Sequence, residues 1–129
     1  MIRHPRNPIL TRADIPVSDA LPRDVSSVFN PGGIKLGGEY VLLLRVQDRG
    51  RRTLFVRAAS ADGVSFRVDG HPVAVSGLEA FPYEIYHLYD PRVTRLEGRI
   101  YVTCAIDCAP GCRSALFETE DCRSLRYLG

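Results

Sequence analysis

An internal repeat of about sixty residues constrains the fold of this chain more than any other feature of its sequence. Segment 36–42, Leu-Gly-Gly-Glu-Tyr-Val-Leu, matches segment 96–102, Leu-Glu-Gly-Arg-Ile-Tyr-Val, at an offset of 60, and segment 52–56 matches 113–117 at an offset of 61. In both copies a turn leads into a long apolar strand, followed by a loop, a second strand, a turn and a short outer strand. This order is typical of a β-propeller blade.

The hydrophobic pattern predicts strands and no long helix. Residues 39–46, Glu-Tyr-Val-Leu-Leu-Leu-Arg-Val, form a continuous apolar run that is typical of a strand buried on both faces. We therefore predict an all-β fold of the β-propeller class. An extended N-terminal arm and first turn are expected at 1–35, a first blade and the start of a second at 36–95, and an incomplete second blade at 96–129.

Two blades are not a closed structure. Each blade of a propeller buries one face against the preceding blade and the other against the next. Two blades alone would leave two apolar faces open, and a closed ring needs at least about four. We therefore expect the sequence either to be part of a longer protein or to assemble with other copies of itself.

The charge and hydropathy of the sequence bear on whether the protein binds nucleic acid or membrane and on where in the cell it is found. Of the 17 basic residues all but Lys35 are arginine, and 15 acidic residues leave a net charge of +2, which does not favour nucleic-acid binding. The sequence has no apolar run of membrane-spanning length, and its first eight residues lack the apolar centre of a signal peptide. We expect a cytoplasmic protein that binds neither nucleic acid nor membrane.

Four cysteines lie in the last quarter of the chain: Cys104, Cys108, Cys112 and Cys122. Their C-x3-C-x3-C-x9-C spacing differs from the C-x2-C pairs of zinc ribbons, and no histidine lies nearby. Free thiols in a reducing compartment are the leading interpretation, with a disulfide or a metal site as alternatives.

The segment Tyr-Asp-Pro-Arg at 89–92 carries the first candidate for chemistry. Pro91 fixes its own φ and disfavours helical angles at the residue before it, so we expect Asp90 to project from an extended, rigid backbone. Aromatic rings stack on sugars, and partial burial raises a carboxyl pKa, which makes Asp90 a candidate general acid in a sugar site. The alternative is an Asp-Pro turn with Arg92 as a surface charge.

Further polar residues lie next to the predicted strands. Asn30 occupies a constrained Asn-Pro-Gly-Gly turn, and Arg45 and Asp48 lie at the end of the apolar strand. Buried arginines are rarely found without a carboxylate or a ligand. Inner strands of a propeller deliver their loops to one end of a central channel, so we expect these residues to converge with Asp90 and Arg92. The alternative for Asn30 is a simple turn residue.

Five short motifs in a fixed order resemble a known family. They are Val-Phe-Asn-Pro-Gly at 28–32, Leu-Arg-Val-Gln-Asp-Arg-Gly at 44–50, Ala-Ala-Ser-Ala-Asp-Gly at 58–63, Tyr-Asp-Pro-Arg-Val-Thr at 89–94 and Gly-Arg-Ile-Tyr-Val-Thr at 98–103. Together they resemble glycoside hydrolase family 130, a family of mannoside phosphorylases and some β-mannosidases built on a five-bladed propeller. The resemblance covers nearly the whole chain and implies that it forms about the first two blades.

The resemblance implies an inverting phosphorolysis of a β-mannoside that releases mannose 1-phosphate. Asp90 would be the catalytic general acid, acting through a sugar hydroxyl, while inorganic phosphate, the co-substrate, attacks the opposite face. Asn30, Arg45 and Asp48 would bind the mannosyl hydroxyls, and Arg92 would orient Asp90 or the start of the strand. The resemblance implies no metal and no organic cofactor.

Two departures from the family pattern limit what the resemblance implies. The residue before Asp-Pro-Arg is often acidic in the family and is Tyr89 here, and Gln47 replaces an acidic residue before Asp48. The phosphate-binding residues of the family lie in later blades, so the sequence does not separate a phosphorylase from a hydrolase. We expect the chain to be inactive alone, as an N-terminal portion of such an enzyme. The alternatives are a non-catalytic carbohydrate-binding half-propeller that self-assembles, or a truncated reading frame.

Overall fold

The computed structural model describes residues 2–129 and contains nine β-strands, two short 3₁₀ turns and no α-helix among them. The strands are β1 (Val25–Leu36), β2 (Glu39–Asp48), β3 (Thr53–Ser60), β4 (Arg67–Pro72), β5 (Ala74–Ser76), β6 (Ile85–Leu96), β7 (Arg99–Cys108), β8 (Gly111–Thr119) and β9 (Ser124–Tyr127), and the turns are η1 (Arg12–Asp14) and η2 (Leu78–Ala80). Within this range no helix has the length and apolarity to cross a bilayer. The all-β prediction is confirmed.

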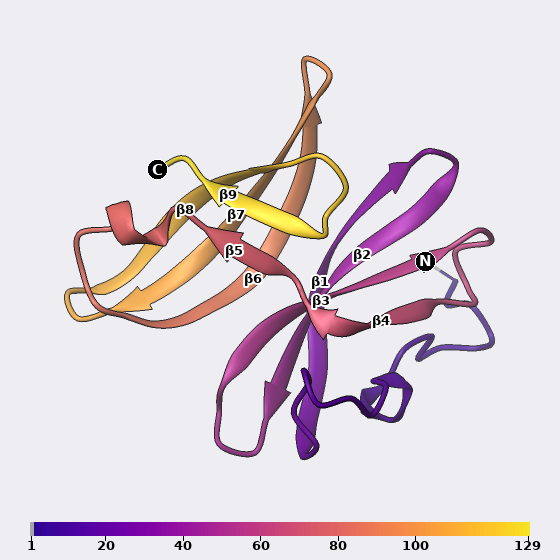
Figure 1. The fold of residues 1–129 in the computed structure, drawn as a ribbon. Helices are drawn as coiled ribbons and strands as arrows, with labels where there is room; N and C mark the ends of the chain where they lie inside the picture. Colours follow the sequence, from indigo (N-terminus) through magenta and orange to yellow (C-terminus); the bar gives the residue numbers. More distant parts are fainter. Residues whose placement is uncertain (1) are drawn as a thin grey trace.

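The strands form two separate sheets that diverge from a shared centre (Figure 1). The first sheet has the order β1-β2-β3-β4, with every neighbouring pair antiparallel. The second has the order β5-β9-β8-β7-β6, in which β5 pairs with β9 in parallel. β5 follows β4 almost immediately in the chain but belongs to the second sheet, so it ties the two sheets together. These are two propeller-type blades packed side by side.

The sixty-residue repeat corresponds to the first hairpin of each sheet. β1 and β6 are both 12 residues long, and β2 and β7 are both 10 residues long, starting at Glu39 and Arg99. For the next strand of each sheet, β3 and β8, the structure gives a different residue offset from the sequence alignment. Tyr40 pairs with Ser60 and Ile100 pairs with Thr119, which gives an offset of 59 rather than 61. The two alignments of β3 with β8 differ by two residues. Side chains alternate between the faces of a strand with a period of two residues, so both alignments place the same residues on the same face, and the hydrophobic pattern cannot distinguish them.

The unit boundaries differ from those expected from the sequence. β1 occupies 25–36, so the second part of the expected arm at 1–35 is the first strand of a sheet. The second sheet contains β6 to β9 as well as β5, so it extends beyond the range 96–129 toward the N-terminus. The prolines near β1 made it resemble an extended arm with a turn, whereas the segment around Pro91 was expected at the start of a strand and lies within β6. Both strands lie at the edge of their sheet, where a residue without a backbone N–H is tolerated.

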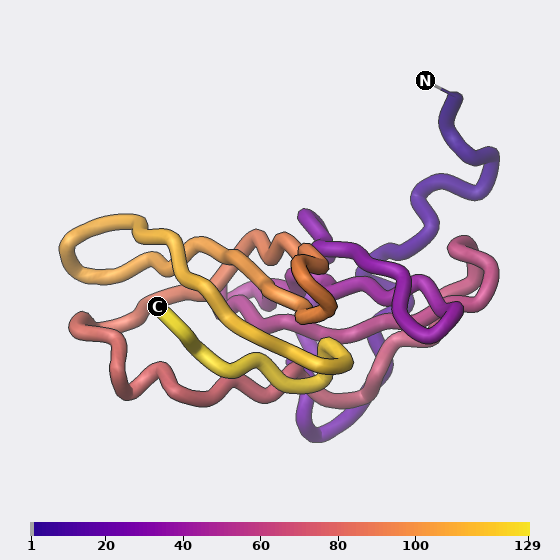
Figure 2. The backbone as a smooth tube through the Cα atoms, turned by 90° about the horizontal axis from the view of Figure 1, so that it is seen from above, coloured from indigo at the N-terminus to yellow at the C-terminus, as the bar shows by residue number. Residues whose placement is uncertain are grey.

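The main hydrophobic core lies between the two sheets. It joins Val41, Leu43 and Phe55 of the first sheet to Ile106 and Phe117 of the second. A smaller core lies on the outer face of the first sheet, where Ile15 and Leu21 of the N-terminal segment cover residues of β2 and β3. Figure 2 shows that the first residues of the chain extend away from both sheets. The N-terminal segment therefore covers one blade face only in part.

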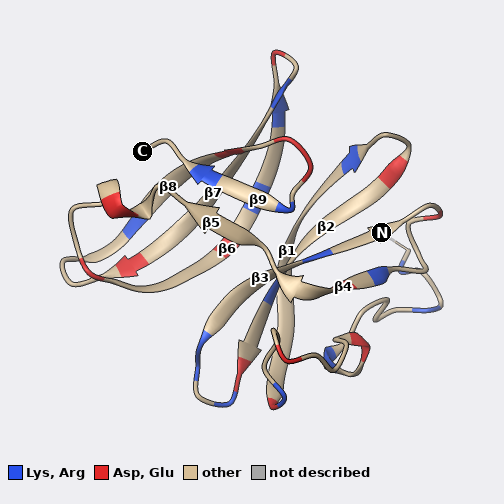
Figure 3. Ribbon diagram, viewed as in Figure 1, with Lys and Arg blue, Asp and Glu red and all other residues tan. Residues whose placement is uncertain are grey.

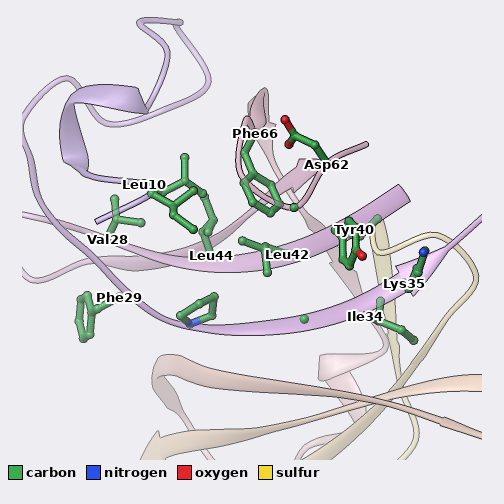
Figure 4. A pocket seen from close by; sticks show the side chains of 15 residues that line it. Leu10, Val28, Phe29, Ile34, Lys35, Tyr40, Leu42, Leu44, Asp62 and Phe66 are labelled. Carbon is green, nitrogen blue, oxygen red and sulfur yellow. The ribbon is translucent and has the colours of Figure 1, made fainter. Parts of the chain in front are cut away.

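An apolar groove of about 750 Å³ remains on that outer face beside the N-terminal segment (Figure 4). Leu10, Leu42, Leu44 and Phe66 line it. The outer face of the second sheet is polar in comparison, because Glu118 there pairs with an arginine on each side, from β7 and from β9. The two outward faces are therefore not equivalent, although the sheets are repeats.

Candidate functional site

A β-bulge interrupts β1 and another interrupts β6, at the same position of the repeat. The register of β1 with β2 shifts between Phe29 and Gly32, and that of β6 with β7 shifts between Tyr89 and Arg92. The residue in each bulge that precedes the proline has a positive φ, 44° at Asn30 and 56° at Asp90. The expectation that Asp90 has an extended backbone was wrong. Asn and Asp tolerate the left-handed region, and the bulge redirects their side chains.

These two side chains and Arg45 meet at the junction of the two sheets. The Asn30 amide Nδ2 donates to Asp90 Oδ1 at 2.9 Å, and Arg45 Nη1 donates to the same oxygen at 2.7 Å. None of the described residues 2–129 donates a hydrogen bond to the other carboxylate oxygen, Oδ2. The Asp90 side chain is 33% exposed, and Oδ2 is not one of the fully buried polar atoms that lack a partner, so Oδ2 is at least partly open to solvent.

Two aromatic rings hold the Arg45 guanidinium. The ring centroid of Phe29 lies 4.3 Å from its central carbon and that of Tyr89 lies 4.8 Å away. Phe29 comes from β1 and Tyr89 from β6, so each sheet supplies one ring. Planar guanidinium groups stack on aromatic faces, and such contacts are worth about 0.5–2 kcal/mol depending on desolvation.

Opposing influences act on the Asp90 carboxyl. The largest single influence is partial burial, which raises the pKa of Asp90. The hydrogen bonds from Asn30 and Arg45 and the charges of Arg45 and Arg92 each lower this pKa, and together they outweigh the effect of burial. The net result is an Asp90 pKa below the ordinary 3.8. The expectation of a raised pKa, based on burial alone, was wrong because the donors convergent on Oδ1 outweigh desolvation.

Arg92 and Asp48 do not contact Asp90 directly. Arg92 is exposed, and its Nη1 donates to the carbonyl oxygen of Pro91 at 3.0 Å, so its charge acts on Asp90 from a distance. Asp48 is the last residue of β2, and its Oδ1 accepts a hydrogen bond from the backbone N–H of Arg52, across the following turn, at 2.9 Å. The Asp48 side chain therefore stabilises the β2–β3 turn.

Sequence reasoning gave Phe29 no role in the site, and it treated Tyr89 as one of the aromatic residues near Asp90 and as a departure from a family pattern, without a contact to Arg45. The Tyr89 hydroxyl donates to the thiol Sγ of Cys112, on β8, at 3.4 Å. This hydrogen bond, followed by desolvation and the nearby acidic groups, raises the pKa of Tyr89 to about 12. An available signal was the repeat itself, which places an aromatic residue before Asn30-Pro31 and another before Asp90-Pro91.

The cysteines are all free, and three of the four are buried. Burial raises the pKa of Cys104 to about 12 and that of Cys122 to about 11. The Cys108 thiol donates to the carbonyl oxygen of Gly111 at 2.8 Å. Among residues 2–129 no group of three or more His, Cys, Asp or Glu side chains is arranged to hold a metal ion.

A second charged cluster lies between the sheets, away from Asp90. The buried Arg57 of β3 donates through Nε to the carbonyl oxygen of Asp121 at 3.1 Å, and Asp69 pairs with Arg123 at 2.8 Å. Arg57 Nη1 lies 3.8 Å from the Asp69 carboxylate, too far for a hydrogen bond. Much of the remaining charge lies near strand ends and in loops (Figure 3). The Arg57 cluster links β3 and β4 to the β8–β9 turn and has a structural role.

No family model matches the sequence, and no curated protein matches it. Solved structures do match the fold. A structure of the GH130 family of mannoside phosphorylases, described as containing hydrolases that target β-1,2-mannosidic linkages in Candida mannan, superposes with a TM-score of 0.79 at 20% identity, over 98% of this chain and 40% of that chain. The β-1,2-mannobiose phosphorylase from Listeria innocua, in complex with β-1,2-mannobiose, gives 0.73 at 20% identity, over 97% and 49%.

A glycosyl hydrolase from Bacteroides ovatus has a TM-score of 0.68 at 21% identity, over 76% of this chain and 30% of that chain. The chain thus has the fold of carbohydrate-active enzymes that include mannoside phosphorylases, as the sequence motifs implied. It spans less than half the length of each of these three proteins.

Proposed function

We propose that this chain supplies part of the sugar site of a cytoplasmic carbohydrate-active enzyme, with Asp90 as its catalytic carboxyl group. The reaction we favour is the inverting phosphorolysis of a β-mannoside to mannose 1-phosphate. The observation that carries the proposal is the convergence of Asn30 and Arg45 on one oxygen of Asp90, which leaves the other oxygen accessible. The similarity in fold to mannoside phosphorylases supports the choice of substrate.

The lowered pKa of Asp90 must be reconciled with acid catalysis. An ionised carboxylate accepts a hydrogen bond from a sugar hydroxyl and orients it, and it can donate a proton only after taking one up. Burial is already the largest influence on this carboxyl. A bound sugar that excludes water would strengthen it and shift the pKa upward. Asp90 would then exchange a proton with the sugar hydroxyl, which relays it to the leaving group.

Phosphate would be the co-substrate, and no metal or organic cofactor would take part. In an inverting reaction phosphate attacks the anomeric carbon from the face opposite the leaving group, so no carboxylate base is needed to activate water. Asn30 and Arg45 would orient Asp90 and the sugar hydroxyls near it, and Arg92 would contribute positive charge. Asp48 would contribute by shaping the β2–β3 turn. Further residues are needed for the phosphate, so we expect no turnover by the 129 residues alone.

A carbohydrate-binding role without catalysis is the second candidate. The low pKa of Asp90 favours it, because an ionised carboxylate is a good acceptor for sugar hydroxyls and a poor proton donor. The apolar groove on the outer face of the first sheet is compatible with closure by further copies of the chain. A β-mannoside hydrolase is a third possibility within the same fold, and it would need a carboxylate base for water.

Binding is the first test of the proposal. β-1,2-Mannobiose should shift the NMR signals of Asn30 and of residues 89–92 in the wild-type chain. The same titration should give no shifts with Asp90→Asn, whose amide cannot accept through two oxygens. Asp19→Asn, at an exposed position, is the matched control and should bind like the wild type. Wild-type binding that is unchanged by Asp90→Asn would contradict the proposal.

Measurements of turnover and of molecular mass distinguish the phosphorylase, the carbohydrate-binding module and the hydrolase. The chain is incubated with β-mannobiose in phosphate buffer and assayed for mannose 1-phosphate and for free mannose, while light scattering gives its mass. We expect a monomer with no turnover. A discrete oligomer that binds sugar without turnover favours the binding module, and free mannose without mannose 1-phosphate favours the hydrolase.

A further inference from the structure

The two repeats differ at the position that faces the aromatic ring. In the first sheet Phe29 pairs with Arg45 across β1 and β2, and in the second sheet Tyr89 pairs with Ala105 across β6 and β7. The second repeat therefore has a methyl group where the first has a long cationic side chain. Ala105 is too small to cover the Tyr89 ring as Arg45 covers that of Phe29, and the guanidinium that lies over the Tyr89 ring comes from Arg45 of the first sheet.

Hydrogen bonds alone do not hold the Arg45 side chain in this orientation. Nη1 bonds to Asp90, but Nε is buried and has no hydrogen-bond partner among residues 2–129. A single bond at one end of a guanidinium leaves the group free to rotate about that contact. The rings of Phe29 and Tyr89 lie against it from both sheets and restrict this rotation.

Tyr89 is itself anchored on its far side. Its hydroxyl donates to Cys112 Sγ on β8, so the ring is held between β8 of its own sheet and Arg45 of the other. Phe29 has no hydroxyl for such a contact. Of the two rings, Tyr89 is therefore the one that fixes the orientation of the guanidinium plane relative to the second sheet, which carries Asp90.

We propose that Tyr89 is a positioning residue: its ring holds the Arg45 guanidinium on Oδ1 of Asp90, so that Oδ2 remains the oxygen that faces a ligand. An unrestrained guanidinium would rotate to bond both carboxylate oxygens, because the two-pronged geometry matches a carboxylate. That rotation would occupy Oδ2. The positioning role follows from the protein contacts alone, and only its consequence for sugar rests on the proposed function.

The test follows the Asp90 carboxyl and the Arg45 guanidinium by NMR in the 129-residue chain. In Tyr89→Leu the Arg45 Nε and Nη signals should broaden or shift, and the Asp90 titration should move away from its wild-type midpoint. Tyr89→Phe keeps the ring and should change both signals less. Tyr86→Leu, on the same strand but 49% exposed, is the matched control and should leave both unchanged.

Two results would overturn the proposal. One is an Asp90 titration in Tyr89→Leu that coincides with the wild type, and the other is an effect of Tyr89→Phe as large as that of Tyr89→Leu. Urea unfolding establishes that each variant is folded before it is titrated. If Tyr89→Leu does not fold, Tyr89→Met also removes the ring but keeps a longer, flexible apolar side chain, and it is judged by the same two results.

A second measurement separates this inference from the proposed function. β-1,2-Mannobiose is titrated into the wild type and Tyr89→Leu. If neither protein binds while the Asp90 and Arg45 signals respond as expected, the positioning role stands and the sugar site is refuted. If the wild type binds and Tyr89→Leu binds equally well with unchanged Asp90 titration, the positioning role is refuted and the sugar site stands.

Discussion

The bulge in β1 and the bulge in β6 have similar backbone conformations but different side chains. Both present a residue with positive φ before a proline at the edge of a sheet. In β1 that residue is the neutral donor Asn30, followed after the proline by Gly32. In β6 it is the charged acceptor Asp90, followed after the proline by Arg92. The repeat thus supplies one geometry twice, and the substitutions convert two equivalent positions into a donor and an acceptor that bond to each other.

The difference between Gly32 and Arg92 shows how closely the two bulges approach. A Cβ at Gly32 would lie 2.7 Å from the carbonyl oxygen of Pro91 and 2.9 Å from Cγ2 of Val93. Gly32 of the first bulge therefore packs directly against the backbone of the second bulge at Pro91, whereas the corresponding residue of the second bulge, Arg92, is exposed.

The largest effect on stability is expected from adding a methyl group where the two bulges touch. Gly32→Ala should lower the free energy of unfolding by about 2 kcal/mol, because the methyl group meets backbone atoms that cannot rotate away. The equivalent change in the other repeat, Arg92→Ala, should stay within about 0.5 kcal/mol of the wild type. Urea unfolding of both variants measures the difference. Equal stabilities would mean that the bulges do not touch.

The next effect comes from removing the cation that the two bulges share. Arg45→Met should destabilise the chain by about 1.5 kcal/mol at neutral pH, since it removes a charged hydrogen bond, and the one-third exposure of Asp90 limits the loss. The loss should shrink in acid, where Asp90 is protonated. Urea unfolding at both pH values, with Arg67→Met on β4 as an exposed control, measures it. A loss that is independent of pH would indicate that packing dominates.

Making the two bulges alike in charge should have a smaller effect. Asn30→Asp places a second carboxylate next to Asp90 and should cost about 1 kcal/mol of stability at neutral pH, because like charges repel and one arginine must serve both. It should also raise the Asp90 pKa. Urea unfolding and an NMR titration test this, with Asn7→Asp in the exposed N-terminal segment as control. A stability equal to that of the wild type would mean that solvent separates the two groups.

The smallest effect concerns pH. The folded-state pKa of Asp90 lies below the ordinary 3.8, so the stability from its ionised form is complete above that value and is lost as pH falls through the folded pKa. Asp90→Asn should therefore be less stable than the wild type by at most about 1 kcal/mol at neutral pH, and the two should converge in acid. Thermal unfolding across pH, with Asp19→Asn as control, measures this. A constant difference would contradict the lowered pKa.

Several features of the site could be read from the sequence, and others could not. Asn30, Arg45 and Asp90 each belong to a motif with local constraints, and the repeat predicted that their strands would adjoin. The aromatic contacts of Phe29 and Tyr89 with Arg45 depend on how the sheets pack, which no local pattern encodes. Asp48 matched a sequence motif, but at the end of β2 its carboxylate accepts a hydrogen bond from the backbone N–H of Arg52. The sign of the Asp90 pKa shift depended on how many donors met at one oxygen.

The sequence by itself determined the all-β class and the repeat, because alternating hydrophobicity and turn residues are local properties of the chain. It did not reveal β1 as a strand, since a proline in an edge strand looks like a loop until the neighbouring strand is known. Only the tertiary structure showed that the two bulges, sixty positions apart, contact each other directly through the Asn30–Asp90 hydrogen bond. The contact of Asn30 and Arg45 with Asp90 depends on the relative placement of two sheets, and that placement is set by the core packed between them.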